Sequence, residues 1–150
     1  MPATPPRTAS LMSTADDIAA QFYEALQQGD IDSLMAVWSD DEDIVCVHPG
    51  GPRVVGAAAI RATFEAIFAN GPIPVTPEHV RSVSTGHCAV HSVAERVEMP
   101  NGQGGTRSAW VMATNVFIHT DHGWRLVAHH ASPGVPDEMQ EITELPSVLH

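Results

Sequence analysis

The stretch that decides the fold is Trp38-Ser-Asp-Asp-Glu-Asp-Ile-Val-Cys-Val-His48-Pro-Gly-Gly-Pro-Arg53-Val-Val-Gly56. It is typical of a helix end, a short strand over 44–48, a tight turn and the start of another helix. His48 is the last residue of the predicted strand and precedes Pro49, whose ring fixes the backbone of the turn. A titratable ring held at a strand end is well placed to face a pocket. His48 is therefore the first candidate site residue.

Helical patterns lie on both sides of this stretch. Thr14 is suited to cap a first helix that ends at Gly29, and Asp30 is suited to cap a second. A third helix is expected over 57–69, because apolar residues recur there at helical spacing and Asn70-Gly71-Pro72 then stops it. The first half of the chain is therefore predicted to be mainly helical.

After Pro72 the chain changes to strand-like segments that are separated by hairpin turns. The expected strands cover 78–84, 87–99, 108–120 and 124–131. Helices followed by an antiparallel meander predict an α+β domain, with the helices covering one face of a curved sheet. We expect one domain over 13–132. A lead-in over 1–12, which lacks the apolar core of a secretory signal, is predicted to be disordered, and 133–150 is predicted to be a loosely packed tail.

The composition excludes several classes of partner. Eighteen acidic and seven basic residues give a net charge of −11, which disfavours nucleic acid and anionic membranes. All seven basic residues are arginine, so lysine Schiff-base chemistry is excluded. No apolar run approaches membrane-spanning length. Two isolated cysteines, Cys46 and Cys88, fit a reducing compartment, and a cytoplasmic location is expected.

A second stretch, Asp121-His-Gly-Trp124-Arg-Leu-Val-Ala-His129-His130-Ala-Ser132, completes a family signature. Together with Gly29-Asp30, Trp38-Ser-Asp-Asp41, Val47-His48-Pro49 and Gly56, it resembles the SnoaL-like branch of the nuclear transport factor 2-like superfamily. The resemblance implies a cone-shaped roll, in which a curved antiparallel sheet wraps round three N-terminal helices. The superfamily holds isomerases, cyclases, dehydratases, hydrolases and non-catalytic binding or assembly domains, so the fold does not fix an activity.

Ketosteroid isomerase, one branch of this superfamily, offers positions for comparison. The place of its general base, an Asp before a Pro at the end of the first strand, is taken here by His48. The place of its oxyanion-hole acid is taken by Asn115. Its oxyanion-hole Tyr corresponds to Phe22, with Tyr23 one residue away, and its pocket Tyr corresponds to Trp38. Because every catalytic position differs, the resemblance implies a similar pocket rather than steroid isomerisation.

Three residues are predicted to carry catalysis if the protein is an enzyme. His48 is suited to proton transfer near neutral pH, and the amide of Asn115 is suited to polarising a carbonyl group. His129 and His130 must face opposite sides of their strand, and the family's His-x-Ser ending favours His130 as the inward one. Each of the three also has a purely structural interpretation, in which it satisfies a buried neighbour.

Six further residues are candidates for binding a ligand. If Asn115 points inward, alternation along the strand places Val111, Ala113 and Phe117 inward as well. The other three are Trp38 as a pocket wall, Arg53 as a partner for a carboxylate ligand, and Ser132. Arg53 could instead pair with the acidic run 40–43. His91 and Glu95 share one strand face and are also possible pocket residues, but the sequence does not say which face is inward.

These observations predict a cofactor-free enzyme that moves a proton on a small apolar carbonyl compound, by isomerisation, cyclisation or dehydration. The alternatives are a non-catalytic ligand-binding module and a dimerising accessory domain. No functional metal is expected, because the nine histidines do not recur at a metal-ligand spacing. A homodimer through the sheet is expected, because alternation leaves an apolar row on its outer face, at Trp110, Met112, Thr114 and Val116.

Overall fold

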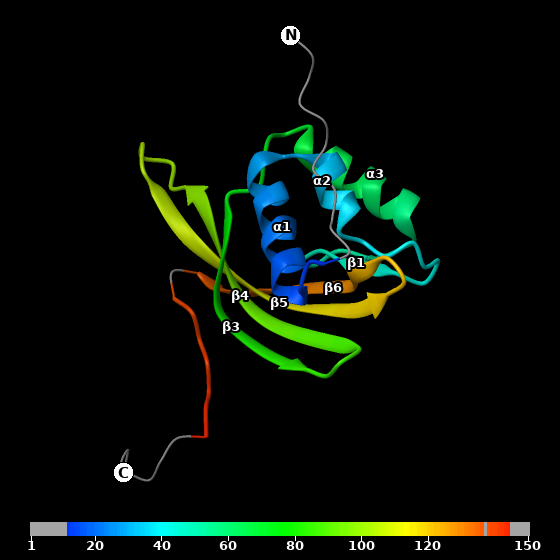
Figure 1. Cartoon of the computed structure of the whole chain (residues 1–150). Helices are drawn as coiled ribbons and strands as arrows, with labels where there is room; N and C mark the ends of the chain where they lie inside the picture. The colour runs from blue at the N-terminus through cyan, green and yellow to red at the C-terminus, as the bar shows by residue number, and fades with distance from the viewer. Residues whose placement is uncertain (1–11, 137, 145–150) are drawn as a thin grey trace.

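The structure of the chain, a computed structural model, describes residues 12–136 and 138–144. Most of the predicted lead-in and the end of the predicted tail therefore lie outside the described residues. Three helices and six strands follow one another along the chain (Figure 1): α1 (Ala15–Gln28), α2 (Ile31–Ala36), β1 (Val45–Val47), β2 (Arg53–Val55), α3 (Ala57–Phe68), β3 (Val75–Ser84), β4 (Cys88–Pro100), β5 (Thr106–Thr120) and β6 (Gly123–Pro136).

The first helix begins and ends where its capping residues predict. The Thr14 hydroxyl accepts a hydrogen bond from the Asp17 backbone N–H at 3.1 Å, and the Asp17 carboxylate accepts one from the Thr14 N–H at 2.9 Å. This reciprocal pair satisfies two N–H groups that a helix start leaves without partners. Gly29 ends α1 in the left-handed conformation, with φ of 66°. Asp30 then caps α2 by accepting from the Ser33 N–H.

The strands form one open, curved sheet in the order β2-β1-β6-β5-β4-β3. The predicted antiparallel meander from β3 to β6 is confirmed. The sheet is nevertheless mixed, because β1 joins the far side of β6 in parallel. β2 was not predicted; it pairs antiparallel with β1 where the sequence indicated only a turn.

The last strand continues beyond the expected domain boundary at 132. It runs to Pro136, and Pro133 and Pro136 pair in register with β5. On its other side, β6 is paired with β1 only over 128–130, so it is an edge strand from there on. Proline is tolerated at such an edge, because its missing N–H is not needed by a neighbouring strand.

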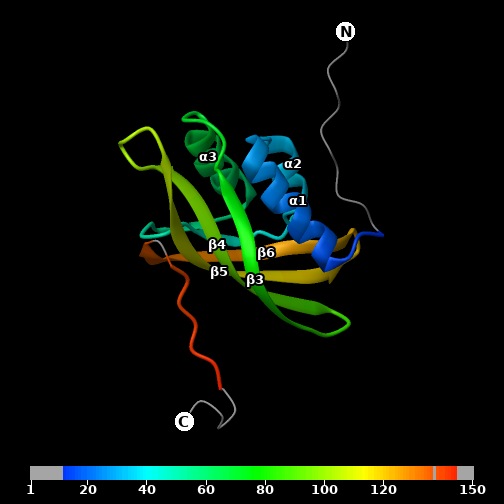
Figure 2. The ribbon, with the colours of Figure 1, turned by 90° about the vertical axis from the view of Figure 1, so that its left-hand side faces the viewer.

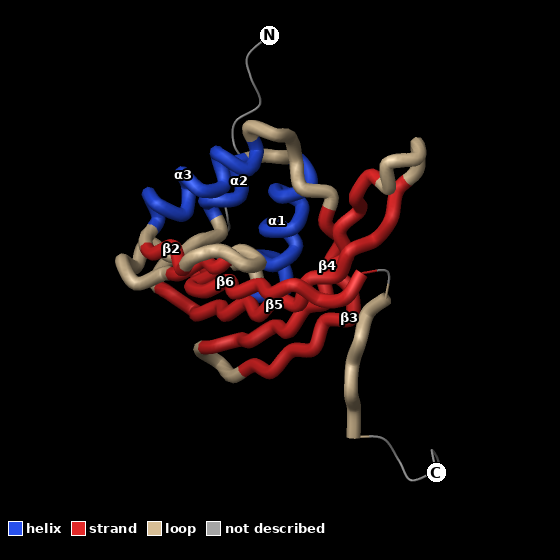
Figure 3. Tube along the Cα trace, turned by 180° about the vertical axis from the view of Figure 1, so that it is seen from behind, coloured by secondary structure: helices blue, strands red, loops and turns tan. Residues whose placement is uncertain are grey.

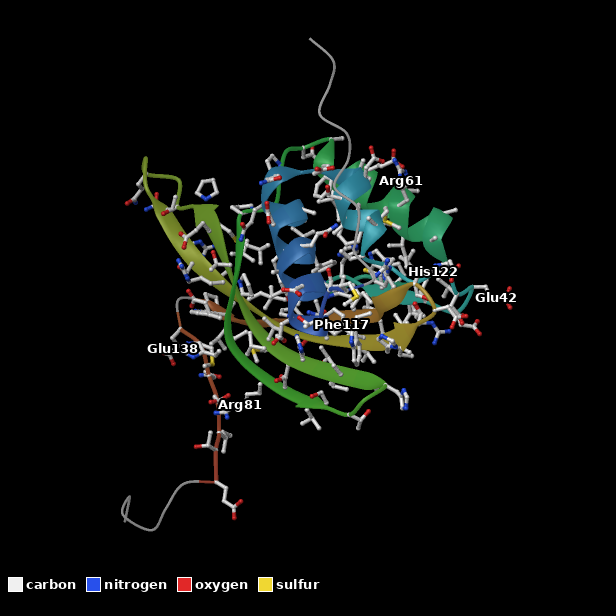
Figure 4. The ribbon with its side chains drawn as sticks, viewed as in Figure 1. Glu42, Arg61, Arg81, Phe117, His122 and Glu138 are labelled. Carbon is white, nitrogen blue, oxygen red and sulfur yellow. The ribbon has the colours of Figure 1, made fainter. Side chains whose placement is uncertain are left out.

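The helices pack together on one face of the sheet and leave the other face uncovered (Figures 2 and 3). The core between the two layers is aromatic. The Phe22 ring lies 6.5 Å from Trp38 and 6.5 Å from Phe64, in edge-to-face contacts between ring centroids. Phe117 of β5, labelled in Figure 4, is 1% exposed beneath them. No helix of the described segments has the length and apolar character needed to cross a membrane.

The role of Gly29 as the left-handed residue that ends α1 can be tested. Gly29→Ala is expected to lower the free energy of unfolding by about 1 kcal/mol, because an alanine strains the left-handed backbone. The added Cβ would itself meet only ordinary contacts, 3.6 Å from Pro72. Urea unfolding measures the loss. Gly86→Ala is the matched control: that glycine has no left-handed φ and open space at its Cβ, so an equal loss there would contradict the interpretation.

Candidate acid–base site inside the cone

A small cavity lies between the helices and the concave face of the sheet, with a volume of about 110 Å³. Most of its wall is apolar. Three titratable side chains, Glu95, His48 and His129, interrupt that wall. The remaining lining residues are Leu26, Pro49, Phe64, Ile73, Val75, Val97, Val111 and Ala131. An apolar pocket with a few converging polar groups is the usual form of a small-molecule site.

Glu95 is the buried acid of this cavity. It projects inward from β4, its residue is 6% exposed, and the Tyr23 hydroxyl donates a hydrogen bond to Oε2 at 2.7 Å. Burial raises the pKa of Glu95 to about 7, against the lowering effect of the Tyr23 hydrogen bond. Both the carboxylate and the carboxylic acid are therefore populated near neutral pH, which is what an acid–base group needs.

A chain of buried hydrogen bonds leads from Glu95 to His129. The Tyr23 hydroxyl accepts from Asn115 Nδ2 at 2.9 Å, and Asn115 Oδ1 lies 2.5 Å from His129 Nδ1. Because the amide oxygen of Asn115 can only accept, Nδ1 of His129 carries the hydrogen. Burial, with smaller effects of His48 and His130, lowers the pKa of His129 to about 3. His129 is thus neutral, and its Nε2 is an acceptor.

His48 directly follows β1, one residue beyond the end of the strand rather than within it, and is half-buried. Its ring packs edge-on against Phe64, with ring centroids 4.9 Å apart, and Nε2 lies 3.8 Å from the Cys46 sulfur. Burial lowers the pKa of His48. Burial, with a smaller effect of Glu95, raises the pKa of Cys46 to about 12, so Cys46 is a protonated thiol rather than a nucleophile.

The inner row of β5 has the orientation that the sequence predicts, but it contributes little to the cavity wall. Ala113, Asn115 and Phe117 are all buried, and Val111 lines the cavity. Asn115 itself is 0% exposed, and both ends of its amide are already bonded to Tyr23 and His129. It therefore holds other residues in place and does not offer its amide to the cavity.

The expectation that His130 faces inward is wrong, and Ser132 shares its outward direction. Both residues are exposed, whereas His129 is 5% exposed and lines the cavity. The reason is a bulge at Val127: Phe117 pairs with Leu126, but Val116 pairs with Ala128. The extra residue reverses the alternation that would otherwise have carried His130 to the same face as Leu126.

Trp38 and Arg53, two candidate ligand-binding residues, lie outside the cavity wall. Trp38 is 5% exposed and packs in the core against Phe22, and its buried Nε1 has no hydrogen-bond partner among the described residues. Arg53 is exposed on β2. Within the part of the chain that the structure describes, no three His, Cys, Asp or Glu side chains converge as metal ligands.

Comparison with known proteins agrees with this architecture. The model of the SnoaL-like domain family matches residues 16–137, and the chain therefore belongs to that family. No curated protein matches the chain.

Several solved structures are similar. One is a proposed dehydratase of the NTF2-like family from Streptomyces avermitilis, 33% identical with a TM-score of 0.68, over 79% of this chain and 91% of that one. Another is a proposed calcium/calmodulin-dependent protein kinase type II association domain from Thiobacillus denitrificans, 29% identical with a TM-score of 0.74, over 84% and 99%. A proposed ketosteroid isomerase from Shewanella frigidimarina, 19% identical with a TM-score of 0.67 over 84% and 100%, shares the fold alone.

The raised pKa of Glu95 makes stability depend on pH. The folded chain holds this proton more tightly than the unfolded chain, whose pKa is near the ordinary 4.5. The stabilisation that this proton gives the folded chain is complete below pH 4.5 and is lost as pH rises through about 7. Relative to Glu95→Gln, the wild type should lose about 3 kcal/mol of unfolding free energy between about pH 5 and about pH 8.

Urea unfolding of both proteins at the two pH values measures this difference. His129 also makes the unfolding free energy depend on pH, but its effect cancels because both proteins contain it. Glu42→Gln, at an exposed glutamate in the acidic turn (Figure 4), is the control and should leave the difference between the two pH values unchanged. Parallel pH dependence of the wild type and Glu95→Gln would contradict the burial effect on Glu95.

Proposed function

We propose that this protein is a cofactor-free enzyme that moves a proton next to the carbonyl group of a small, largely apolar compound. The observation that carries the proposal is Glu95: a carboxyl group with a pKa of about 7 in the wall of an apolar cavity. A base of this pKa is matched to proton transfer near neutral pH. Isomerisation, aldol-type cyclisation and dehydration all begin with such a transfer.

In the proposed reaction, the Glu95 carboxylate removes the proton from the carbon beside the carbonyl group. The electron pair left on that carbon moves to the carbonyl oxygen, which becomes an enolate. Neutral His48, at the half-buried end of the cavity, stabilises this oxygen by donating its ring N–H. Where a carbon–carbon double bond is conjugated with the enolate, protonated Glu95 returns the proton to the far carbon of that double bond; the double bond moves next to the carbonyl group, which completes an isomerisation. The Tyr23 hydrogen bond holds the carboxyl group in one orientation throughout.

The size of the cavity limits the substrate. A volume of about 110 Å³ is smaller than the roughly 150 Å³ of an engineered cavity that binds benzene. The reacting part of the substrate is therefore a small ring or a short chain. Any larger remainder would extend past His48 and Pro49, where the wall is partly exposed.

Hydrogen–deuterium exchange tests this proposal without knowledge of the natural substrate. In D₂O, the wild type should catalyse exchange of the protons beside the carbonyl group of small cyclic ketones and enones, followed by NMR. Glu95→Gln should slow the exchange by about 100-fold or more, since that is the usual contribution of a general base. His48→Ala should slow it with the fold retained. Glu42→Gln is the control, and wild-type exchange in Glu95→Gln would overturn the assignment of the base.

A non-catalytic binding module is the second candidate, and the satisfied hydrogen-bond network supports it. Tyr23 and Asn115 bond to Glu95, to His129 and to each other, so only Glu95, His48 and Nε2 of His129 are left to meet a ligand. Saturation-transfer NMR on the same ketones separates the two candidates. Binding without exchange of the protons beside the carbonyl group would support the binding module.

We also propose a homodimer through the outer face of the sheet. Cross-strand registers align six small apolar residues in one row across all six strands, which we call the outer apolar row: Val55, Val45, Ala128, Val116, Val90 and Val83. Val83 is 76% exposed and Val55 45% exposed. A continuous apolar patch of this kind is rare on a monomer's surface and suits a second copy of the same sheet.

The dimer is tested by a sedimentation-velocity concentration series. The wild type should sediment as a dimer at micromolar concentration, and Val83→Asp should shift it to the monomer, because a buried charge at the interface is costly. Ile142→Asp is the control, since Ile142 is fully exposed outside the sheet. A wild type that remains monomeric throughout the series would contradict the proposal.

The two cysteines support a reducing compartment, such as the cytoplasm, for this protein. Cys46 on β1 and Cys88 on β4 are free thiols, and Cys46 is 1% exposed. Buried cysteines of this kind behave as small apolar residues.

A further inference from the structure

A second concave region lies further along α1, between this helix and strands β3 and β4. It consists of two adjoining hollows of about 300 and 380 Å³, which share Asp16, Ser82 and His91; we call it the α1–β3 groove. No residue of its wall lines the cavity at Glu95. The groove and the cavity therefore have different walls, and Tyr23, which lines the groove and bonds to Glu95, links them.

The groove has small residues on its helix side and a bent strand on its other side. The face of α1 that borders it carries two alanines, Ala19 and Ala20. Opposite them, β3 has a register shift between Glu78 and Arg81, and His79 within it has a left-handed φ of 46°. Such a bulge bends a strand and is common next to functional sites.

One half of the groove is apolar and the other half is polar. The apolar half runs along the two alanines and contains Val80 and Val93. The polar half is lined by hydroxyl-bearing side chains and by the ring of Trp124; the hydroxyls belong to Thr14, Ser82, Ser84 and Thr85. A wall divided in this way is suited to a ligand with a polar head and an apolar body.

His91 and Asp16 form the centre of the groove. Their nearest atoms, His91 Nε2 and Asp16 Oδ1, are 3.3 Å apart, and the His91 side chain is 5% exposed while that of Asp16 is 87% exposed. Ser82 is the cross-strand partner of His91 and lies on the same face of the sheet. Burial lowers the pKa of His91, against the raising effect of Asp16. Because His91 is uncharged, the negative charge of the Asp16 carboxylate is the net charge of the His91–Asp16 pair.

The charges around the groove favour a cation. Among the described residues, no arginine lines it, and the chain contains no lysine. The neighbouring Arg81, labelled in Figure 4, does not line the groove and pairs with Glu141, 2.7 Å away. A net charge of −11 adds a field that attracts cations and repels anions.

We propose that the α1–β3 groove is a second ligand site, which takes a small organic amine. The ammonium group lies at Asp16 and Ser82, and the apolar body lies along Ala19, Ala20 and Val80. An ammonium group has three N–H donors, which the Asp16 carboxylate and the groove hydroxyls can accept. The ring of Trp124 provides a further favourable surface for a cation. An exposed carboxylate alone binds a cation weakly, so the apolar contacts are needed as well.

Three probes with the same ring and a similar chain test the charge preference: 2-phenylethylamine, 2-phenylethanol and 3-phenylpropionate. Each is titrated into the full-length ¹⁵N-labelled protein, and amide chemical shifts are followed. The amine should shift the amides of Asp16, Ser82 and His91 and bind several-fold more tightly than the alcohol, with the carboxylate weakest.

Two variants decide whether Asp16 is responsible. Asp16→Asn should lower the affinity for the amine to that for the alcohol and leave the alcohol unchanged; Asp16 takes no part in the Thr14–Asp17 capping pair, so the helix is kept. Glu42→Gln removes the same charge from a distant turn and should change nothing. Equal binding of amine and carboxylate, shifts confined to the cavity at Glu95, or full amine affinity in Asp16→Asn would each overturn the proposal.

Discussion

The hydroxyl group of Tyr23 fixes the position of α1 on the sheet, and the rest of the interior depends on it. It donates to Glu95 on β4 and accepts from Asn115 on β5, which in turn bonds to His129 on β6. One helix and three strands are thereby joined by groups that would each cost about 1–3 kcal/mol if left buried and unpaired. Tyr23 also lines the α1–β3 groove, so one side chain borders the groove and holds the acid of the cavity in place.

Burial acts on all titratable groups of the cavity, but in opposite directions for acids and bases. It raises the pKa of Glu95 to about 7 and lowers that of His129 to about 3 and that of His48 below its ordinary range. Near neutral pH, Glu95 is therefore the member of this group that changes protonation state. The two histidines stay neutral and can only donate or accept hydrogen bonds. The roles of the three side chains follow from desolvation rather than from their residue types.

The sequence predicts the parts of the structure that depend on neighbouring residues. Thr14, Gly29 and Asp30 mark helix ends through local chemistry, and they are correctly placed. The bulge at Val127 has no such marker, and the His-x-Ser ending of the family resemblance favours His130, whereas the structure turns His129 inward. The sequence places Glu95 on the same strand face as His91, but the inward direction of that face shows only in the fold, where Tyr23, 72 positions away, bonds to Glu95. β2 is not predicted, because Arg53–Val55 lies between a Pro/Gly turn and a helix start; β1 is equally short, but the apolar run from Ile44 to Val47 indicates it.

The parallel pairing of β1 with β6 has a consequence for how the chain reaches this fold. Val45 pairs with Ala128, and Cys46 pairs with His129, so the sheet is completed only when β6, the last of the described strands along the chain, has formed. Until then, the apolar faces of the three helices have only part of the sheet to cover them. Such long-range closure carries a high loop entropy and slows folding. During synthesis, part of the apolar surface of the helical half therefore stays exposed until β6 has been made.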